Sequence, residues 1–248
     1  MNTSISGLFV TGVGTDVGKT VVTAGLVRLL QSAEYKVLPV KPVQSGGINN
    51  PLGKMDSPDG EVYKSAGAVW NIDKQCPYIF EPACSPHLAA RLSGVELNVV
   101  DIADKVRQLE GQATLIAEGA GGIFVPLNGE QTMLDLMKEL SYPVILVAGN
   151  KLGVINDTLL SLAALKQAGV KVAGVIMTSS AGPEPLEFGM AEDNIRSIET
   201  FSGVKVLASI PYISNWDPAE LRCWTEVDRA LAKIDLNSFA KSPESSTE

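Results

Sequence analysis

Short runs of apolar residues, most of them rich in β-branched side chains, recur along the chain without regular alternation with polar positions. Strands that are buried on both faces of a parallel sheet have this pattern, whereas strands with one solvated face alternate. The runs predict strands at Leu8–Thr11, Val37–Val40, Ala113–Glu118, Val144–Ala148, Val172–Met177 and Val204–Ile210.

The segments between these runs have helical periodicity. They predict helices at Val21–Ser32, Val100–Gln108, Met133–Leu140, Asn156–Ala168, Glu192–Ser202 and Trp224–Ile234. Strands that alternate with helices are typical of a three-layer α/β fold, in which a mostly parallel central sheet lies between helices on both faces. Ligands of such sheets bind beyond the carboxyl ends of the strands, so we expect functional residues directly after the predicted strands.

The composition is that of a globular protein, because 45% of the 248 residues are hydrophobic and 19% are charged. We expect a single domain over residues 1–241 and a disordered polar tail over residues 242–248. The formal net charge of −8 argues against nucleic-acid binding, which needs a basic surface. We expect no membrane association, since no apolar run reaches the roughly 18 residues of a membrane span. We expect no signal peptide, because the first six residues lack the charged start and the long apolar core of one.

The number and spacing of the cysteine and histidine residues exclude the metal sites that these two residue types commonly form. Cys76, Cys84 and Cys223 are too scattered for a zinc site and are expected to be reduced thiols of a cytoplasmic protein. The single histidine excludes a multi-histidine metal site.

The first predicted strand runs into a glycine-rich turn, Gly12–Gly18, and then through Lys19 and Thr20 into an apolar helix. This order is that of a P-loop, whose backbone N–H groups and helix dipole bind a triphosphate. Lys19 would reach the β- and γ-phosphates, and the Thr20 hydroxyl would bind Mg²⁺. The standard spacing would place a glycine at Val13, so the loop is one residue longer or differently wound.

A lysine and a carboxylate follow the next two predicted strands. Lys41 would point a second cation into the crevice of the P-loop, which suits phosphoryl transfer, or it is a surface lysine before a turn. Glu118 ends an apolar strand, where a Walker-B acid binds Mg²⁺, or it belongs to an ordinary charged turn. The glycines after Glu118 would let the backbone approach a ligand closely.

Three further segments leave a functional and a structural interpretation open. One of Asp56, Asp59 and Glu61, in a predicted loop, would be a second Mg²⁺ ligand, or all three are solvated. His87, in a predicted proline-rich loop, would touch a substrate or be structural. The free N–H groups within Lys151–Asn156 would hold a carboxylate, or the segment is an ordinary loop with an asparagine helix cap.

Five blocks in a fixed order resemble the dethiobiotin synthetase family. They are Thr11–Thr20, Lys41–Gly46, Pro77–Phe80 with Ser85–His87, Glu118–Gly122 and Lys151–Asn156, and the resemblance spans about residues 8 to 215. It implies a P-loop NTPase fold and a homodimeric, ATP-dependent cyclo-ligase of biotin biosynthesis. Such an enzyme closes the ureido ring of dethiobiotin from 7,8-diaminononanoate, CO₂ and ATP, with Mg²⁺ as cofactor.

The resemblance also implies roles for individual residues. Lys19, Lys41 and Thr15 would be catalytic, with Lys41 beside the carbamate and the γ-phosphate. Thr20, Asp59 and Glu118 would hold the metal, which selects Asp59 from its acidic segment. The nucleotide-binding residues would be Asp16, Val17, Gly18, Lys19, Thr20, Val21, Asp59, Glu118, Gly119, Ala120, Gly121, Thr178, Ser179, Pro211, Tyr212 and Ile213.

By the same resemblance, two subunits share the substrate site. Ser45 would hydrogen-bond the diamine or its carbamate. The distal carboxylate of the substrate would bind across the dimer interface at a helix start formed by Gly153, Val154, Ile155 and Asn156. The reaction requires positioning and charge neutralisation and needs neither a histidine base nor a cysteine nucleophile.

Two positions depart from the family pattern. Gly14 stands where the family usually has an acid. Thr178 and Ser179 stand where many members have an Asn-Asp pair against adenine. Without that pair, we expect discrimination between bases of only about 1–2 kcal/mol, unless backbone groups near residues 211–213 read the base.

The main alternative is a nucleotide-driven switch ATPase of the partitioning or septum-placement type, which shares the fold. Its additional loop lysine is absent, because Gly14 stands at that position, and the C-terminus here is acidic and polar rather than basic or amphipathic. A cobyrinate or cobyrate amidation enzyme would need a glutaminase domain, for which we expect no room in 248 residues.

Lys19→Ala is expected to abolish phosphate binding and essentially all turnover, because the lysine is the loop's main cation for a triphosphate. Nucleotide affinity measured by calorimetry, together with the turnover rate of the purified variant, checks this. Normal affinity and rate would mean that the segment is an ordinary strand-to-helix turn.

Overall fold

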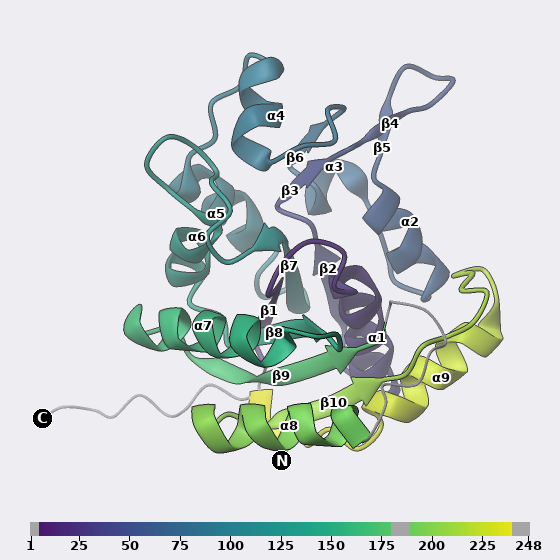
Figure 1. Cartoon of the computed structure of the whole chain (residues 1–248). Helices are drawn as coiled ribbons and strands as arrows, with labels where there is room; N and C mark the ends of the chain where they lie inside the picture. Colours follow the sequence, from purple (N-terminus) through teal and green to yellow (C-terminus); the bar gives the residue numbers. More distant parts are fainter. Residues whose placement is uncertain (1–4, 180–188, 240–248) are drawn as a thin grey trace, which may run out of the picture.

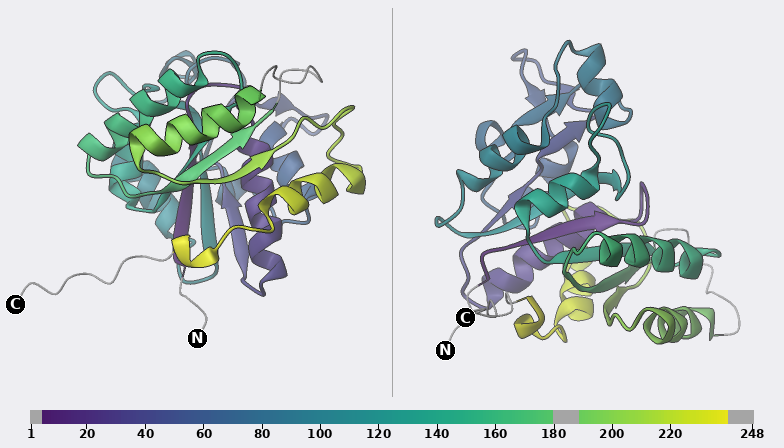
Figure 2. Two further views of the ribbon diagram at one scale, coloured as in Figure 1. Left: turned by 60° about the horizontal axis from the view of Figure 1, so that its bottom comes forward. Right: turned by 90° about the vertical axis from the view of Figure 1, so that its left-hand side faces the viewer.

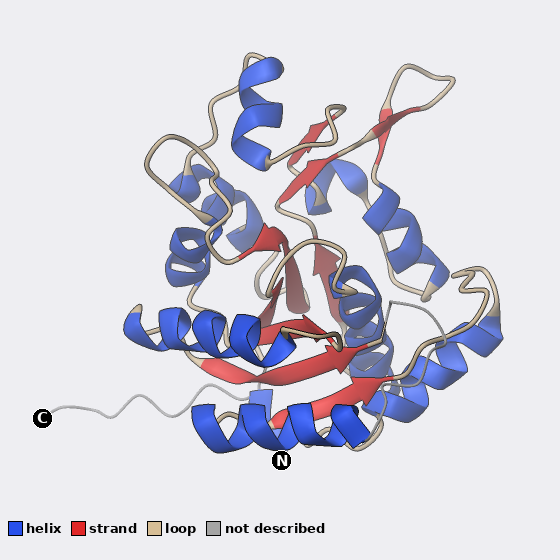
Figure 3. Cartoon of the chain, in the orientation of Figure 1, coloured by secondary structure: helices blue, strands red, loops and turns tan. Residues whose placement is uncertain are grey.

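The computed structural model describes residues 5–179 and 189–239, which form a central sheet with helices on both of its sides (Figure 1 and Figure 3). The main sheet has the strand order β10-β9-β8-β1-β7-β2, and every neighbouring pair is parallel. Its strands are β1 (Gly7–Gly12), β2 (Val37–Val40), β7 (Thr114–Gly122), β8 (Val144–Gly149), β9 (Val172–Thr178) and β10 (Val206–Ile210). The predicted strands and the predicted parallel sheet are confirmed.

Side chains of each central strand enter cores on both faces of the sheet. In β1, Leu8 and Val10 pack into one core and Phe9 packs into the other, and all three are fully buried. This two-sided burial explains why the strands lack polar alternation. The helices of the first face are α1 (Lys19–Ser32) and α9 (Leu221–Leu231), and those of the second are α5 (Val99–Arg107), α6 (Met133–Leu140), α7 (Val154–Gln167) and α8 (Met190–Ser202), as the two views of Figure 2 show.

The chain from β3 to α4, residues 43–92 between β2 and α5, forms a separate layer of small elements that the sequence analysis did not predict. It rises from the carboxyl end of β2 (Figure 1). Its elements are β3 (Val43–Ser45) paired with β6 (Tyr78–Phe80), the hairpin of β4 (Ile48–Asn49) and β5 (Met55–Asp56), and the helices α2 (Pro58–Ser65), α3 (Ile72–Gln75) and α4 (Pro86–Leu92). A 3₁₀ helix, η2 (Leu236–Phe239), ends the described part of the chain.

This layer corrects two predictions. Asp59 and Glu61 lie in the first turn of α2 and not in a loop, because Ser57 caps the helix by accepting a hydrogen bond from the Gly60 N–H. His87 likewise lies in α4, which begins at Pro86. Proline is tolerated at a first helical position, since the N–H it lacks has no partner there.

Most predicted boundaries shift by one to four residues, and two of the shifts concern proposed binding residues. Helix α7 begins at Val154, and its N-cap is Gly153 with φ 92, so Asn156 lies inside the first turn and the predicted asparagine cap is wrong. Strand β7 continues through the glycines that were predicted to follow it, because Gly122 still pairs with Gly12 of β1. The glycine segment is therefore part of the sheet that carries the P-loop.

Among the helices of the described residues, none is both long and apolar enough to cross a membrane. Cys76, Cys84 and Cys223 are free thiols, as predicted. The tail predicted to be disordered, residues 242–248, lies outside the described residues, and so do residues 1–4 of the amino-terminal segment.

Gly60→Ala is expected to destabilise the fold by about 1–3 kcal/mol through overpacking, which outweighs the gain of ~1 kcal/mol in helix propensity. A Cβ at Gly60 would lie 2.4 Å from the ring of Trp70, which leaves no room for a methyl group. Urea unfolding measures the change. Gly129→Ala is the control, because no atom lies within 4 Å of its added Cβ. Equal midpoints for the two variants would contradict this packing account.

Candidate active site

The loop between β1 and α1 needs glycine at two positions for different reasons. Gly18 is the N-cap of α1 with φ 83, a left-handed conformation that L side chains rarely adopt. A Cβ at Gly12 would lie 2.6 Å from the Val17 side chain. Gly14 has neither constraint, because its added Cβ meets no atom within 4 Å. The loop therefore has room for a ligand or a larger side chain at Gly14.

Lys19 folds back over this loop, and its Nζ donates a hydrogen bond to the Gly14 carbonyl at 2.8 Å. Within the part of the chain that the structure describes, no carboxylate lies at ion-pair distance from Lys19. Burial lowers the pKa of Lys19, and the charge of Lys41 acts in the same direction, against the carboxylates of Glu118 and Asp59. Among the described residues, Lys19 therefore has only the Gly14 carbonyl as a partner at its Nζ, and a bound phosphate would give it an anionic partner instead.

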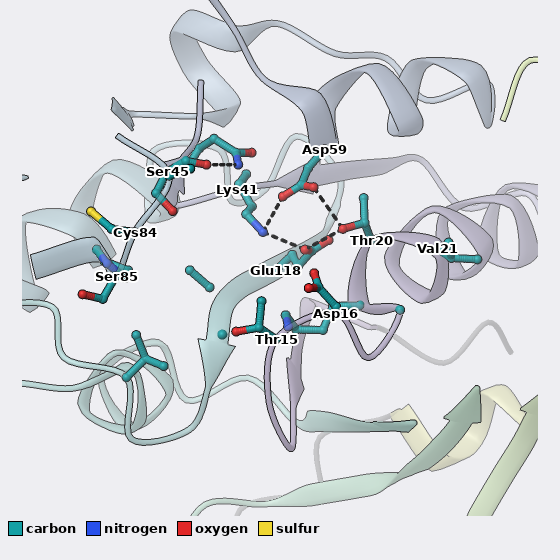
Figure 4. A pocket seen from close by; sticks show the side chains of 18 residues that line it. Thr15, Asp16, Thr20, Val21, Lys41, Ser45, Asp59, Cys84, Ser85 and Glu118 are labelled. Carbon is teal, nitrogen blue, oxygen red and sulfur yellow. Dashed lines mark hydrogen bonds and ion pairs between the residues drawn. The ribbon is translucent and has the colours of Figure 1, made fainter. Parts of the chain in front are cut away.

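Lys41 is the centre of a buried ionic network (Figure 4). Its Nζ lies 2.6 Å from Asp59 Oδ2 and 2.7 Å from Glu118 Oε1, and 3.3 Å from the Gly119 carbonyl. The side chain of Lys41 is only 5% exposed and that of Glu118 only 1%. Burial by itself lowers the pKa of Lys41, but the charges and hydrogen bonds of Glu118 and Asp59 outweigh it and hold that pKa above its ordinary value. Lys41 is therefore a permanent cation and not a surface lysine before a turn.

Thr20, in the first turn of α1, faces the same two carboxylates. Its Oγ1 lies 3.1 Å from Asp59 Oδ1 and 3.1 Å from Glu118 Oε1. A hydroxyl has one hydrogen and can donate it to only one of these oxygens at a time. At the other contact, the Thr20 oxygen and a carboxylate oxygen face each other with no hydrogen between them. A cation would stabilise that arrangement.

These oxygens fit a Mg²⁺ ion bound with a nucleotide. Mg²⁺ is usually held by one or two carboxylates together with phosphate and water oxygens. The described residues contain no cluster of three histidine, cysteine or acidic side chains. Two carboxylates and one hydroxyl are instead the donor set of an ion that takes its remaining ligands from phosphates and water.

A cavity of about 790 Å³ opens beside this network. It is lined by twelve of the residues that the sequence analysis proposed for the site: Thr15, Asp16, Gly18, Lys19, Thr20, Val21, Lys41, Ser45, Asp59, Glu118, Ala120 and Gly121. The lining also includes Gln44, Ala83, Cys84, Ser85, Pro86 and Val125, to which the sequence analysis gave no role. Gln44 could have been found from its place in the Lys41–Gly46 block, whereas Ala83 and Val125 carry no chemical signal.

Other proposed residues do not line this cavity. They are Val17, Gly119, Gly153–Asn156, Thr178, Ser179 and Pro211–Ile213. Val17 and Gly119 contribute backbone carbonyls instead: the Val17 carbonyl accepts a hydrogen bond from Thr178, and the Gly119 carbonyl accepts one from Lys41.

The Thr178 hydroxyl supports the P-loop, because it donates to the Val17 carbonyl at 2.8 Å and is buried. Its single hydrogen is therefore committed to the loop. Only its lone pairs remain for other partners. The predicted weak discrimination between bases stays a prediction.

Three titratable residues that the sequence analysis considered for the site do not join this network. Asp56 lies in the β4–β5 hairpin and accepts from Asn50 at 3.1 Å. Glu61 pairs with Lys64 on the exposed face of α2 at 2.7 Å. His87 does not line the cavity, and its Nδ1 is a buried atom without a hydrogen-bond partner among the described residues. Of the three acids in this segment, the structure brings only Asp59 to Thr20 and Lys41.

Sequence comparison identifies close relatives. The model of a family described as an AAA domain matches residues 6–220. A protein of Anoxybacillus flavithermus named ATP-dependent dethiobiotin synthetase BioD is 37% identical over 88% of this chain and 96% of its own length. A protein of the same name from Idiomarina loihiensis is 36% identical over 86% of this chain and 96% of its own length.

Structural comparison finds the same fold in more distant proteins. The cell division ATPase MinD of Pyrococcus furiosus has a TM-score of 0.51 at 19% identity, covering 92% of this chain and 99% of its own. A ParA family ATPase of Chlorobium tepidum has a TM-score of 0.53 at 12% identity, and the match covers 92% of this chain and 97% of the ATPase. At such identities these neighbours share the P-loop NTPase fold alone.

Asp59→Asn is expected to weaken the binding of Mg²⁺ with a nucleotide by roughly tenfold or more, because it removes one anionic oxygen beside Thr20. Asp56→Asn, the same substitution three positions away in the hairpin, should leave binding unchanged. Titration of each variant with Mg²⁺ in the presence of ADP gives both values. A larger loss for Asp56→Asn would assign the metal to the hairpin and not to α2.

Proposed function

Because the chain belongs to the ATP-dependent dethiobiotin synthetase family, we propose that the cavity beside Lys41 is the site of its ring-closing reaction. Members of this family are ATP-dependent ligases that form C–N bonds and use Mg²⁺. The observation that carries the proposal is the convergence of Lys19, Lys41, Asp59 and Glu118 on one cavity at the end of the P-loop. The formal charges of two lysines and two carboxylates cancel, so the site can accept a cation together with a polyanion.

The triphosphate would lie along the P-loop. The backbone N–H groups from Asp16 to Val21 and the amino terminus of α1 would surround its oxygens. Lys19 would exchange the Gly14 carbonyl for the β- and γ-phosphates, while Thr20, Asp59 and Glu118 would hold Mg²⁺. When bound, Mg²⁺ neutralises phosphate charge and orients the γ-phosphate for attack.

The chemistry proceeds in steps that conserve atoms. One amine of 7,8-diaminononanoate adds to CO₂ and loses a proton, which gives a carbamate. A carbamate oxygen attacks the γ-phosphorus and ADP leaves, so a carbamic-phosphoric anhydride forms. The second amine attacks the carbonyl carbon and loses a proton, phosphate leaves, and the ureido ring closes. No step requires a protein nucleophile.

The residues around the cavity would orient the substrate and stabilise negative charge. Lys41 would lie beside the carbamate and the γ-phosphate, where its permanent positive charge stabilises the oxygens of the transferring group. Thr15 would donate to the same phosphate from the P-loop. Ser45 would hydrogen-bond the diamine or its carbamate from the end of β3, on the wall opposite the P-loop (Figure 4).

A second subunit would complete the site. The amino terminus of α7, Gly153–Asn156, does not line the cavity of its own chain. The Val154 N–H donates to the Lys151 carbonyl at 3.1 Å, so the N–H groups of Ile155 and Asn156 would be the ones available to the carboxylate of a substrate in a partner's cavity. Two large apolar side chains of this segment lie exposed, Leu152 at 88% just before α7 and Leu160 at 63% within it. An exposed apolar surface of this kind supports a homodimer with α7 at the interface. A cytoplasmic location is part of the proposal, and the free thiols support it.

Turnover with the substrates tests the function directly. The purified protein, given 7,8-diaminononanoate, bicarbonate and MgATP, should form a product heavier than the diamine by the mass of CO₂ less that of water, and one ADP should appear per product. Without the diamine, ADP release should fall to a small background. Steady ATP hydrolysis that is independent of the diamine, with no cyclic urea formed, would instead favour the switch-ATPase alternative.

A further inference from the structure

A tyrosine outside the cavity lining contacts the carboxylate at the centre of the site. Tyr63 of α2 is fully buried, and its hydroxyl donates a hydrogen bond of 2.5 Å to Glu118 Oε2. The contact joins residues 55 positions apart in the sequence. None of the sequence blocks that indicated the site includes Tyr63.

The two oxygens of Glu118 have different partners as a result. Oε1 faces the cavity, where it accepts from Lys41 at 2.7 Å and lies 3.1 Å from Thr20 Oγ1. Oε2 faces away from them and accepts from the Tyr63 hydroxyl. With both oxygens held from opposite directions, rotation of the carboxylate group would break at least one charge-assisted hydrogen bond.

Helix α2 links this contact to the second carboxylate of the site. Asp59 and Tyr63 are four positions apart, so they project from the same face of the helix. Asp59 reaches Lys41 and Thr20 while Tyr63 reaches Glu118 behind them. One short helix therefore sets the position of one carboxylate and the orientation of the other.

The Tyr63 ring is itself fixed by its neighbour. The ring of Trp70 packs edge-on against it, with centroids 5.2 Å apart and an interplanar angle of 66°. The backbone of Gly60 lies directly under Trp70, where any side chain would collide with the indole. Trp70, Tyr63 and Glu118 thus form a continuous support for the oxygen that faces the cavity.

We propose that Tyr63 is a positioning residue for the metal site: it commits Glu118 Oε2, so that Glu118 offers Oε1 alone to a cation bound with the nucleotide. The proposal rests on the assignment of Glu118 as a metal ligand under the proposed function. A carboxylate held in this way binds a cation through one oxygen or through water. Mg²⁺ requires near-ideal octahedral geometry, which a single fixed oxygen satisfies more readily than two oxygens of one carboxylate.

Tyr63→Phe isolates the hydroxyl, because it keeps the ring and its contact with Trp70. The expected effect is a loss of metal affinity of roughly 10–100-fold, the usual result of removing a group that orients a metal ligand. Electron paramagnetic resonance can measure this as the dissociation constant of Mn²⁺, a paramagnetic substitute for Mg²⁺, in the complex with ADP. In turnover, the Mg²⁺ concentration for half-maximal rate should rise while kcat at saturating Mg²⁺ returns toward the wild-type value.

Tyr142→Phe is the matched control. Tyr142 is 2% exposed and donates a hydrogen bond of the same 2.5 Å to Glu110, but it lies beside the amino end of β8, at the opposite edge of the sheet from the cavity. This variant should bind Mn²⁺ like the wild type. The affinity of each variant for ADP without metal and its melting temperature show whether the fold and the P-loop are intact.

Wild-type Mn²⁺ affinity in a folded Tyr63→Phe variant would overturn the proposal. So would a fall in kcat with unchanged metal dependence, which indicates a structural role only. If Tyr63→Phe does not fold, Trp70→Phe provides a second test, because a smaller ring leaves Tyr63 less restrained and should weaken Mn²⁺ binding in the same direction. A wild-type protein that makes no dethiobiotin would refute the proposed function and leave these metal measurements interpretable.

Discussion

The buried contact between Lys41 and the carboxylates of Glu118 and Asp59 is the interaction on which the rest of the site depends. Removing three charges from water is costly, and the cost is offset only when each charge is paired and hydrogen-bonded. Here every charged oxygen that lies near Lys41 has a donor, from Lys41 itself, Thr20 or Tyr63. The network therefore fixes the position of each ligand before a nucleotide binds, which reduces the reorganisation required when it does.

The fold brings these groups together from elements that are distant in sequence. The adjacent strands β1, β7 and β2 end at the same edge of the sheet and carry the P-loop, Glu118 and Lys41 there. Because parallel strands place their carboxyl ends side by side, the segments that follow these three strands meet at one site. The inserted layer between β2 and α5 then supplies what the sheet cannot, namely Asp59 and Tyr63 from α2 and Ser45 from β3.

Much of this architecture could be predicted from the sequence, and what could not has physical reasons. Strands buried on both faces have continuous apolar runs, which can be recognised in the sequence. The P-loop can be recognised from its Gly-Lys-Thr residues, which directly follow such a strand and a glycine-rich turn. Helices α2 and α4 were missed because they are short and have little apolar periodicity, although Ser57-Pro58 and Ser85-Pro86 both carry the cap-then-proline signal of a helix start. Tyr63 could not be found at all, since an aromatic residue in a short helix is ordinarily a core residue and only the three-dimensional contact with Glu118 distinguishes it.

A crystal structure with MgADP tests the account most directly, because its central claim is that the residues around Lys41 form one metal and phosphate site. The account predicts a Mg²⁺ ion held near Thr20 Oγ1, directly or through water by Asp59 and by Oε1 of Glu118, with Tyr63 still on Oε2. It also predicts that Lys19 Nζ leaves the Gly14 carbonyl for the β-phosphate. A metal ion bound at the hairpin carboxylate of Asp56, or a Lys19 that remains on Gly14 while the nucleotide lies elsewhere, would contradict it.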